Sequence, residues 1–501
     1  AKVFDGTGGP GQVLDIALRD GRVAAQGHGL PAEAARSVHD ARGAWLVPGL
    51  LDIHTHEDLE VELEPGLPEV VRHGTTTVVA GNCSIGLAFG NQRRDGQDPI
   101  VDCFARVENI PKPVLAKAAE RAVWRTTGDY LEHLDALPLG ANITPLLPHS
   151  MLRIEVMGLE DSITRDPTEE ELRAMVALLE RAMEEGYPGF STDSLPLHFL
   201  AAREHVSKRI PTQYAAFGEY RALTDVVRRH ERVWQMTPAT DDAGLTLKLM
   251  FLTSGRLYGR PLKVTALAAL DTVNNRATRR RATGLAKLLN SRLVGGRFRM
   301  QALAAPFRIW SEGAVSPLAE GDPLMRRLIE TELEDREARR RILEDPAYVE
   351  AFRDMWSRGK SGFGIARLKR LLRLEDGFLT RDLDDMVVYR SPVPEWEGLS
   401  LASVHARYES WRRQGDAAAA GADEQLAFAA LGREVRDDGE FFVALLRHFD
   451  RDLYWHYVQA NRDPAVIRQL LLEPELLPGF NDSGAHVTNM AFYDGNLRAL
   501  A

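Results

Sequence analysis

The sequence predicts an α/β fold: a (β/α)8 TIM-type barrel with a small N-terminal β-sandwich module and a large helical insertion between strands 7 and 8. From Pro48 onward, brief apolar segments alternate with longer helical stretches, which is typical of a parallel α/β architecture. We count eight apolar segments of this kind, the number that closes such a barrel. Polar residues able to bind metal follow several of them, at the strand ends where barrel active sites form.

Residues 1–47 predict a small β module. Short apolar runs are separated by turns, and Asp20-Gly21 lies between two alternating runs, which is a strong signal for a β-hairpin. The strands that would pair with this module are expected after the barrel in the chain, beyond residue 501.

The barrel is expected to comprise residues 48–306 and 473–501. Its eight strands are expected to end, in order, near His54, Cys83, His149, Asp193, Thr237, Ala266, Ala302 and Asp482. Between strands 3 and 4, DPTEEELRAMVALLERAMEEG predicts a helix with Asp166 as its N-cap, Pro167 in the first turn and Gly186 at its end.

Residues 307–472 are too long for one β/α unit, and they predict a helical insertion or lid. The segment is charged and helical in parts, and it includes an alanine-rich patch at residues 416–421. An insertion after strand 7 lies over the C-terminal face of a barrel, so a lid that selects substrates is one interpretation. An oligomerisation surface, which would make the protein a homo-oligomer, is the other, and the two have equal weight.

The composition argues against several classes of function. The formal net charge is -10 and the pI is near 5.8, which disfavours nucleic acid or an anionic membrane as the main partner. One segment, ATRRRATGLAKLLNSR around Arg279–Arg281, is a candidate basic patch, although a solvated helix face is the more usual interpretation. Two cysteines, no apolar run of about 20 residues and no visible signal peptide favour a reducing, cytoplasmic location.

The stretch PGLLDIHTHEDLE places two histidines at the end of the first strand. His54 and His56 alternate along this strand, so both point to the same face and both can reach one metal ion. Two polar residues at a strand end can also form a simple hydrogen-bonded rim. The pair alone does not decide between these interpretations.

Three further residues favour a metal site. Cys83, in VVAGNCSIG, offers a thiolate that suits zinc, although an isolated cysteine is often only a small buried apolar residue. Asp482, in PGFNDSGAH, can bind metal, accept a proton or cap a helix. His149, in LLPHSMLR, can join the site or bond to backbone. All lie at C-terminal strand ends, and this convergence predicts an active site.

Five segments in this order resemble the amidohydrolase superfamily, specifically its N-acyl-D-amino-acid deacylase (D-aminoacylase) branch. They are PGLLDIHTHEDLE, HGTTTVVAGNCSIGLA, LLPHSMLRIEVMG, GYPGFSTD and LPGFNDSGAH. The resemblance is strongest in residues 43–88 and 147–193, and it fades in residues 307–472. It implies a barrel hydrolase that uses zinc and a water or hydroxide to attack an amide carbonyl of a small molecule.

The resemblance also implies a ligand set, with two departures. The family's paired histidines fall on His54 and His56, its cysteine on Cys83 and its strand-eight aspartate on Asp482. The family has further histidines in strands 5 and 6, where this sequence has VWQMTPAT and LKVTALAAL. One zinc ion per subunit, rather than two, is therefore expected. Arg153, Ser191 and Lys263 are candidate substrate-binding residues, with Lys263 two positions from the family's lysine.

The mechanism that these expectations support assigns a role to three residues. Asp482 would take a proton from a metal-bound water, which would then attack as hydroxide. Asp482 would pass this proton to the leaving nitrogen. Either His149 or His486 would donate a hydrogen bond to the developing oxyanion. Two alternatives stay open: hydrolysis of another C–N or ester bond, such as a cyclic imide or carbamoyl group, and a non-catalytic binding or assembly role.

Overall fold

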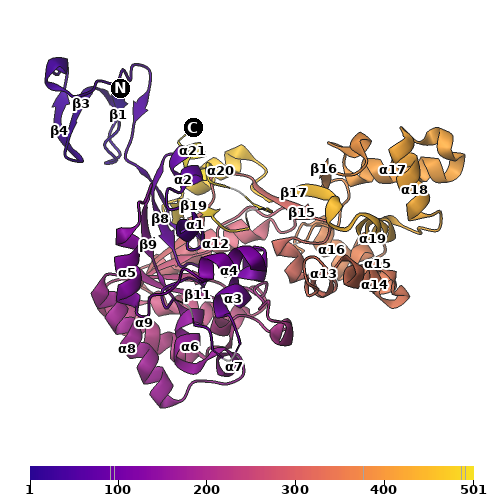
Figure 1. The fold of residues 1–501 in the computed structure, drawn as a ribbon, viewed down its shortest axis with the longest axis horizontal. Helices are drawn as coiled ribbons and strands as arrows, with labels where there is room; N and C mark the ends of the chain where they lie inside the picture. The colour runs from indigo at the N-terminus through magenta and orange to yellow at the C-terminus, as the bar shows by residue number, and fades with distance from the viewer. Residues whose placement is uncertain are drawn as a thin grey trace.

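The computed structural model describes residues 1–90, 92–94, 96–375, 377, 379–486, 488–490 and 492–500. Figure 1 shows three parts along the chain: a small β module at the N-terminus, a barrel surrounded by helices, and a mainly helical part on the opposite side. None of the helices in the described residues is both long enough and apolar enough to cross a bilayer.

The barrel contains the eight predicted strand positions, all joined by parallel pairing. Strands one, three and eight are each interrupted and are therefore assigned as two short strands. Pairing runs from the first strand through the second to the third, from the third through to the eighth, and from the eighth back to the first, which closes the barrel. In chain order the strands are β6 (Leu50–Asp52) with β7 (His54–Thr55), β8 (Thr75–Ala80), β9 (Asn142–Pro145) with β10 (Leu147–Pro148), β11 (Gly189–Asp193), β12 (Val233–Thr237), β13 (Lys263–Ala266), β14 (Arg297–Ala302) and β18 (Leu476–Pro478) with β19 (Phe480–Ser483).

Helices cover the outside of the barrel. The helix between strands three and four, α8, begins two residues later than predicted, because Thr168 rather than Asp166 is its N-cap. Thr168 Oγ1 accepts from Glu171 N, the Glu171 side chain accepts from Thr168 N, and Gly186 ends the helix. The helices of this part are α1 (Glu60–Leu63), α2 (Pro68–Arg72), α3 (Pro99–Val107), α4 (Lys112–Ala119), α5 (Thr127–Ala136), α6 (His149–Met157), α7 (Leu159–Ser162), α8 (Glu169–Glu185), α9 (Phe217–Arg229), α10 (Ala243–Met250), α11 (Gly255–Tyr258), α12 (Ala277–Asn290), α20 (Pro464–Leu471) and α21 (Gly495–Arg498).

Between β14 and β18 the chain forms the mainly helical part. A three-stranded antiparallel sheet, β15–β17–β16, lies at its base, and we did not predict these strands from the sequence. The part has its own hydrophobic core, which includes the buried Trp356, Trp396 and Trp455. Its elements are β15 (Phe307–Glu312), α13 (Pro323–Ile329), α14 (Arg336–Glu344), α15 (Pro346–Ser357), α16 (Ile365–Leu371), β16 (Val387–Arg390), α17 (Leu401–Gln414), α18 (Ala422–Leu431), α19 (Asp438–Phe449) and β17 (Tyr454–Ala460).

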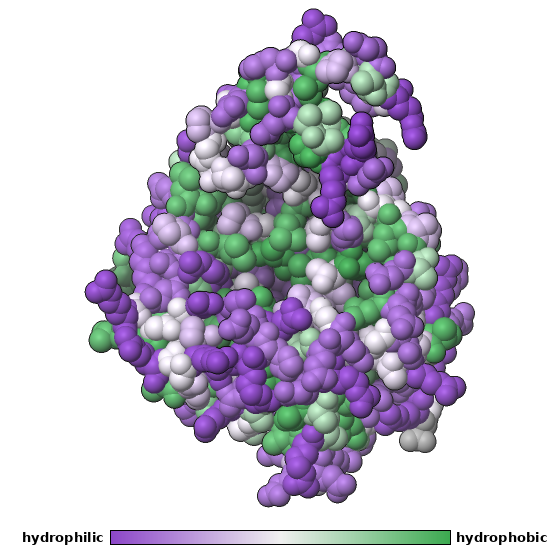
Figure 2. Space-filling model, turned by 90° about the vertical axis from the view of Figure 1, so that its left-hand side faces the viewer, coloured by the Kyte–Doolittle hydropathy of each residue, from purple (hydrophilic) through white to green (hydrophobic). Residues whose placement is uncertain are grey.

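The N-terminal module contains the predicted hairpin. Strands β3 (Asp15–Arg19) and β4 (Arg22–Gly27) pair antiparallel, and the turn residues Asp20 and Gly21 both have positive φ, as a type I′ turn requires. The other three strands, β1 (Lys2–Val3), β2 (Gln12–Val13) and β5 (Trp45–Leu46), form a second small sheet. Figure 2 shows apolar side chains gathered in a band below this module, on the face that it shares with the barrel.

Candidate metal centre

Four side chains meet at the C-terminal end of the barrel. One ligand atom from each of His54, His56 and Cys83 lies within 4.8 Å of the other two, and all three residues are buried. Asp482 completes the group, because its Oδ1 lies 3.7 Å from His54 Nε2 and 3.6 Å from His56 Nε2. The residues come from strands one, two and eight, which are neighbours in the closed barrel, so the four predicted ligands are brought together.

The Nδ1 atom of each histidine contacts a side chain that is far away in the sequence, and this contact orients the ring. His54 Nδ1 lies 2.9 Å from the side-chain oxygen of Gln301, on strand seven, and a neutral imidazole bonded there turns its Nε2 lone pair toward Cys83 and Asp482. His56 Nδ1 lies 3.2 Å from Oε1 of Glu108, the C-cap of α3, which leaves Nε2 facing Asp482. This is the support that metal-binding histidines usually have.

Cys83 lies in a tightly constrained loop after strand two. Cys83 and Ser84 have φ values of 48° and 70°, a region that residues other than glycine rarely adopt. Cys83 N donates to the side chain of Gln235, and Ser191 Oγ both accepts from Ser84 N and donates to Gly81 O. Ser191 is fully buried, so it supports the cysteine loop rather than facing a substrate, contrary to the sequence-based expectation.

The end of strand eight is constrained in the same way. Asp482 has a φ of 56° and His486 a φ of 45°. Gly484 lies so close to the backbone of His56 that a Cβ atom there would be 2.8 Å from the carbonyl oxygen. The buried Asp52 joins strands one and eight, accepting from His54 N, Asn481 N and Ser483 Oγ.

Burial sets the protonation preferences of the four groups. It lowers the pKa of His54 to about 3 and that of His56 well below its ordinary value, so both imidazoles are neutral, as metal binding requires. Burial also raises the pKa of the Cys83 thiol well above its ordinary range and that of Asp482 to about 7. A bound cation would favour the ionised forms of Cys83 and Asp482. Two imidazoles, one thiol and one carboxylate are a donor set that fits zinc.

Among the described residues, strands five and six offer no comparable donors at the barrel mouth. On strand five, Thr237 Oγ1 lies 3.4 Å from Cys83 Sγ, and Gln235 is already bonded to the cysteine backbone. Strand six ends at Ala266. Hydroxyl, amide and methyl groups are weak zinc ligands or none, so the residues of these two strands do not fit a second zinc ion.

Two groups near the centre were not identified from the sequence. Glu108 lies 3.2 Å from His56 and 3.6 Å from Nε2 of His486, so it links both histidines. His198 follows strand four, and its Nδ1 lies 2.9 Å from Oδ2 of Asp193. Although burial lowers the pKa of His198, the Asp193 carboxylate outweighs it and the net shift is upward. The partner of His198, Asp193, lies at a predicted strand end, so a local sequence pattern could have pointed to this pair. No local pattern points to Glu108.

Three residues predicted for the site lie elsewhere. His149 is fully buried, with Nδ1 2.9 Å from Thr212 Oγ1 and Nε2 2.8 Å from Glu219 Oε1, so both ring nitrogens are already occupied. Arg153 is also fully buried and pairs with Glu219. Lys263 begins β13, at the opposite end of the barrel, where its ammonium group donates to the Glu231 carbonyl. None of the three is free to contact a substrate at the metal centre.

A cleft of about 700 Å³ lies between the barrel and the mainly helical part. One wall comes from α3 and α4, and the other from the segment between α13 and α14. The cleft reaches Asn109, which follows Glu108, and Thr488, which is two residues after His486. Its lining therefore comes close in the chain to Glu108 and His486, but it includes none of the four candidate ligands.

Comparisons with known proteins agree with the geometry. An uncharacterized protein of Mycobacterium tuberculosis is 34% identical over 504 residues, which cover 99% of this chain and 75% of that protein. The N-acyl-D-aspartate deacylase of Alcaligenes xylosoxydans xylosoxydans is 38% identical over 193 residues, 38% of this chain and 35% of the enzyme. A scan against protein-family models gave no match.

Two solved structures share the fold. The N-acyl-D-glutamate deacylase of Bordetella bronchiseptica, in complex with zinc and a phosphonate inhibitor, aligns with a TM-score of 0.51 and 20% identity over 95% of this chain and 73% of that one. A D-aminoacylase described as having a binuclear metal centre, with one-metal activation and second-metal attenuation, aligns with a TM-score of 0.52 and 19% identity over 96% and 74% of the two chains.

Proposed function

Because this chain belongs to the amidohydrolase superfamily, with a D-aminoacylase-like structure, we propose that it is a hydrolase that cleaves an amide C–N bond with one zinc ion. The observation that carries the proposal is the convergence of His54, His56, Cys83 and Asp482 at the barrel mouth. The D-aminoacylase with one-metal activation gives a precedent for catalysis with a single ion.

Each of the four residues has a proposed role in metal binding or proton transfer. His54 Nε2, His56 Nε2 and Cys83 Sγ would hold the metal, which when bound supplies a Lewis acid for a carbonyl oxygen and for water. Asp482 Oδ1 faces both histidines, which leaves Oδ2 to accept a proton from the attacking water and deliver it to the leaving nitrogen. A carboxyl group in a buried position is suited to this exchange, because burial brings its pKa toward neutrality.

His486 is the remaining candidate for the oxyanion. Its Nδ1 is buried and has no hydrogen-bond partner among the described residues, so it is available to a substrate atom. Burial lowers the pKa of His486 to about 3, which keeps the ring neutral. The 700 Å³ cleft, whose lining includes Thr488 two residues after His486, is large enough for a small-molecule amide.

Hydrolysis by the zinc-loaded protein tests the proposal. We expect release of the acyl group from members of a panel of N-acyl-D- and N-acyl-L-amino acids, cyclic imides, carbamoyl compounds and esters, with amides cleaved fastest. A chelator should abolish turnover and added zinc should restore it, whereas His54→Ala protein should stay inactive in both conditions. If protein with confirmed zinc content cleaves no amide in the panel, the proposal is wrong.

The absence of histidines from strands five and six favours one second candidate, a non-catalytic binding or assembly protein. The same experiment separates the two functions. A wild-type protein that binds no metal and hydrolyses nothing would support this second candidate. The convergence of four candidate ligands, three of them buried and two at positions with constrained backbone, supports the enzyme instead.

A further inference from the structure

A basic cleft of about 690 Å³ lies apart from the four metal ligands, where the barrel meets the mainly helical part. Its walls come from the loop after strand six and the start of α12, from the turn after α16, and from the loop after β17. Five arginines from these three segments line it: Arg276, Arg279, Arg280, Arg373 and Arg462. Two of them belong to the basic segment noted in the sequence.

Backbone hydrogen bonds tie the three walls together. Arg276 N donates to Arg373 O at 2.9 Å, and Glu375 N donates to Asn274 O at 3.1 Å. The same loop is joined to the end of β17, because Val273 N donates to Gln459 O at 2.9 Å. The cleft is therefore a built feature of the fold, with walls that do not depend on a ligand.

Two of the five arginines form ion pairs, and the other three form none with the residues that the structure describes. Arg279 lies 3.4 Å from Asp271, and Arg462 lies 2.9 Å from Asp385. The other acidic residue of the cleft, Asp463, accepts from Ala465 N and caps α20. Within the described part of the chain, the guanidinium groups of Arg276, Arg280 and Arg373 have no ion pair, so the cleft carries an excess of positive charge although the protein has a net charge of -10.

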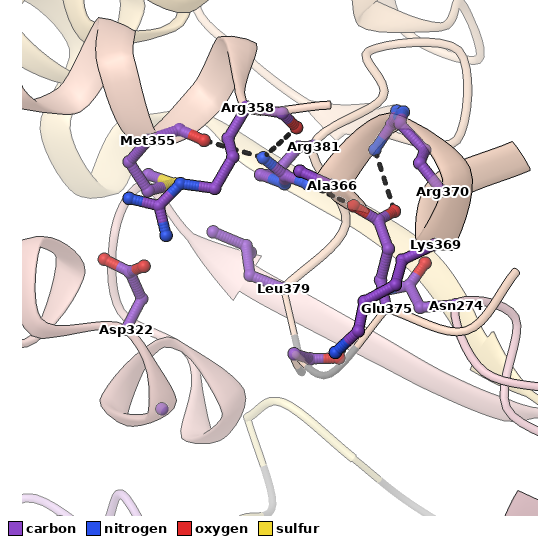
Figure 3. Close-up of a pocket in the computed structure, with 12 residues that line it drawn as sticks. Asn274, Asp322, Met355, Arg358, Ala366, Lys369, Arg370, Glu375, Leu379 and Arg381 are labelled. Carbon is purple, nitrogen blue, oxygen red and sulfur yellow. Dashed lines mark hydrogen bonds and ion pairs between the residues drawn. The ribbon is translucent and has the colours of Figure 1, made fainter. Parts of the chain in front are cut away.

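In the neighbouring pocket, by contrast, two of the arginines are paired with carboxylates. This pocket, of about 260 Å³, lies on the other side of α16 and shares the 271–276 loop through Asn274. Figure 3 shows Glu375 between Arg370 and Arg381, and Arg381 also donates to two carbonyl groups. Asp382 forms a further ion pair with Arg370. Arg370 and Arg381 therefore stabilise a local network, whereas Arg276, Arg280 and Arg373 of the basic cleft form no ion pair within the described part of the chain.

We propose that the basic cleft binds a phosphorylated small molecule through Arg276, Arg280 and Arg373. Guanidinium groups bind phosphate oxygens with paired hydrogen bonds, and three of them match a phosphate or diphosphate group of two or more negative charges. A monocarboxylate would satisfy only one. A nucleic acid needs a longer basic track, but Arg370 and Arg381 of the adjoining pocket are paired with carboxylates and the whole chain is acidic.

Calorimetric titration of the full chain with inorganic pyrophosphate tests this site. We expect saturable binding at physiological ionic strength, weakened about tenfold or more in Arg280→Gln and in Arg373→Gln, because each change removes a charge-assisted hydrogen bond. Arg281→Gln is the matched control, since Arg281 is also exposed and on α12 but does not line the cleft. Melting temperatures close to that of the wild type would show that the variants are folded.

Three results would overturn the proposal. They are undetectable pyrophosphate binding by the wild type, equal loss in Arg281→Gln and Arg280→Gln, and an affinity for single-stranded oligonucleotides that exceeds that for pyrophosphate and rises with their length. Binding that disappears at physiological salt counts as the first result, because it would reflect general charge attraction only. None of these outcomes depends on whether the metal centre is catalytic.

Discussion

The two halves of the barrel mouth differ in the chemistry that they offer to a metal. Strands one, two and eight supply the buried His54, His56 and Cys83 and the partly exposed Asp482, each held by its own hydrogen bonds or constrained backbone. Strands five and six supply Thr237 and Ala266 at the corresponding ends. The contrast teaches that neighbouring strands of a closed barrel can bring together a full set of candidate ligands while two other strands present only residues that bind zinc weakly or not at all.

Removal of the thiol should give the largest effect. Cys83→Ala takes away the only sulfur ligand, and we expect zinc content to fall at least tenfold and hydrolysis to be lost. Metal analysis by mass spectrometry after dialysis measures this. Cys103→Ala is the control, because Cys103 is equally buried but lies in α3, outside the ligand cluster. Retention of zinc by Cys83→Ala would exclude the thiol as a ligand.

Asp482→Asn should separate metal binding from proton transfer. His54, His56 and Cys83 are unchanged in this variant, so we expect zinc content close to that of the wild type, while kcat falls by about 10²–10⁴-fold for lack of a base. Zinc content and kcat should be measured on the same preparation. Near-normal turnover in this variant would remove Asp482 from the proposed mechanism.

Gln301→Leu tests the support of His54 from strand seven. Loss of the 2.9 Å contact frees the imidazole to rotate, and we expect zinc affinity to weaken by about 10–100-fold. Competition with a chromophoric chelator gives the affinity. Gln459→Leu, at a buried glutamine of β17, should leave it unchanged. An unaltered affinity in Gln301→Leu would show that His54 is held by other contacts.

The smallest effect is expected on the strand-five side. Thr237→Val replaces the hydroxyl near Cys83 with a methyl group of similar shape, and zinc content should change by less than about twofold. The same dialysis and metal analysis apply. A loss of zinc comparable to that in Cys83→Ala would mean that both halves of the mouth bind metal.

The barrel strands and the candidate ligands could be predicted from the sequence because each is marked by a short pattern of neighbouring residues. Each strand is a short apolar run, and the four ligands follow such runs at three of the strand ends. The supporting residues have no such signal: Gln301 and His54 are 247 residues apart, and Glu108 is the end of a helix that no pattern relates to His56. Only the closed barrel brings these residues together.

Two other differences have physical reasons. His149 lies at a strand end as predicted, but Thr212 and Glu219 occupy both of its ring nitrogens, which its sequence position could not indicate. Lys263 lies at the first residue of its strand, and in a parallel barrel that is the end away from the active site. The strands β15 and β17 were missed because the charged helical pattern around them dominated the interpretation of that segment.

The zinc stoichiometry of the wild-type protein tests the central claim most directly. Native mass spectrometry of protein dialysed against a small excess of zinc should find one ion per chain, held by the half of the mouth that carries the two histidines, the cysteine and the aspartate. Two ions per chain, or none, would contradict the account.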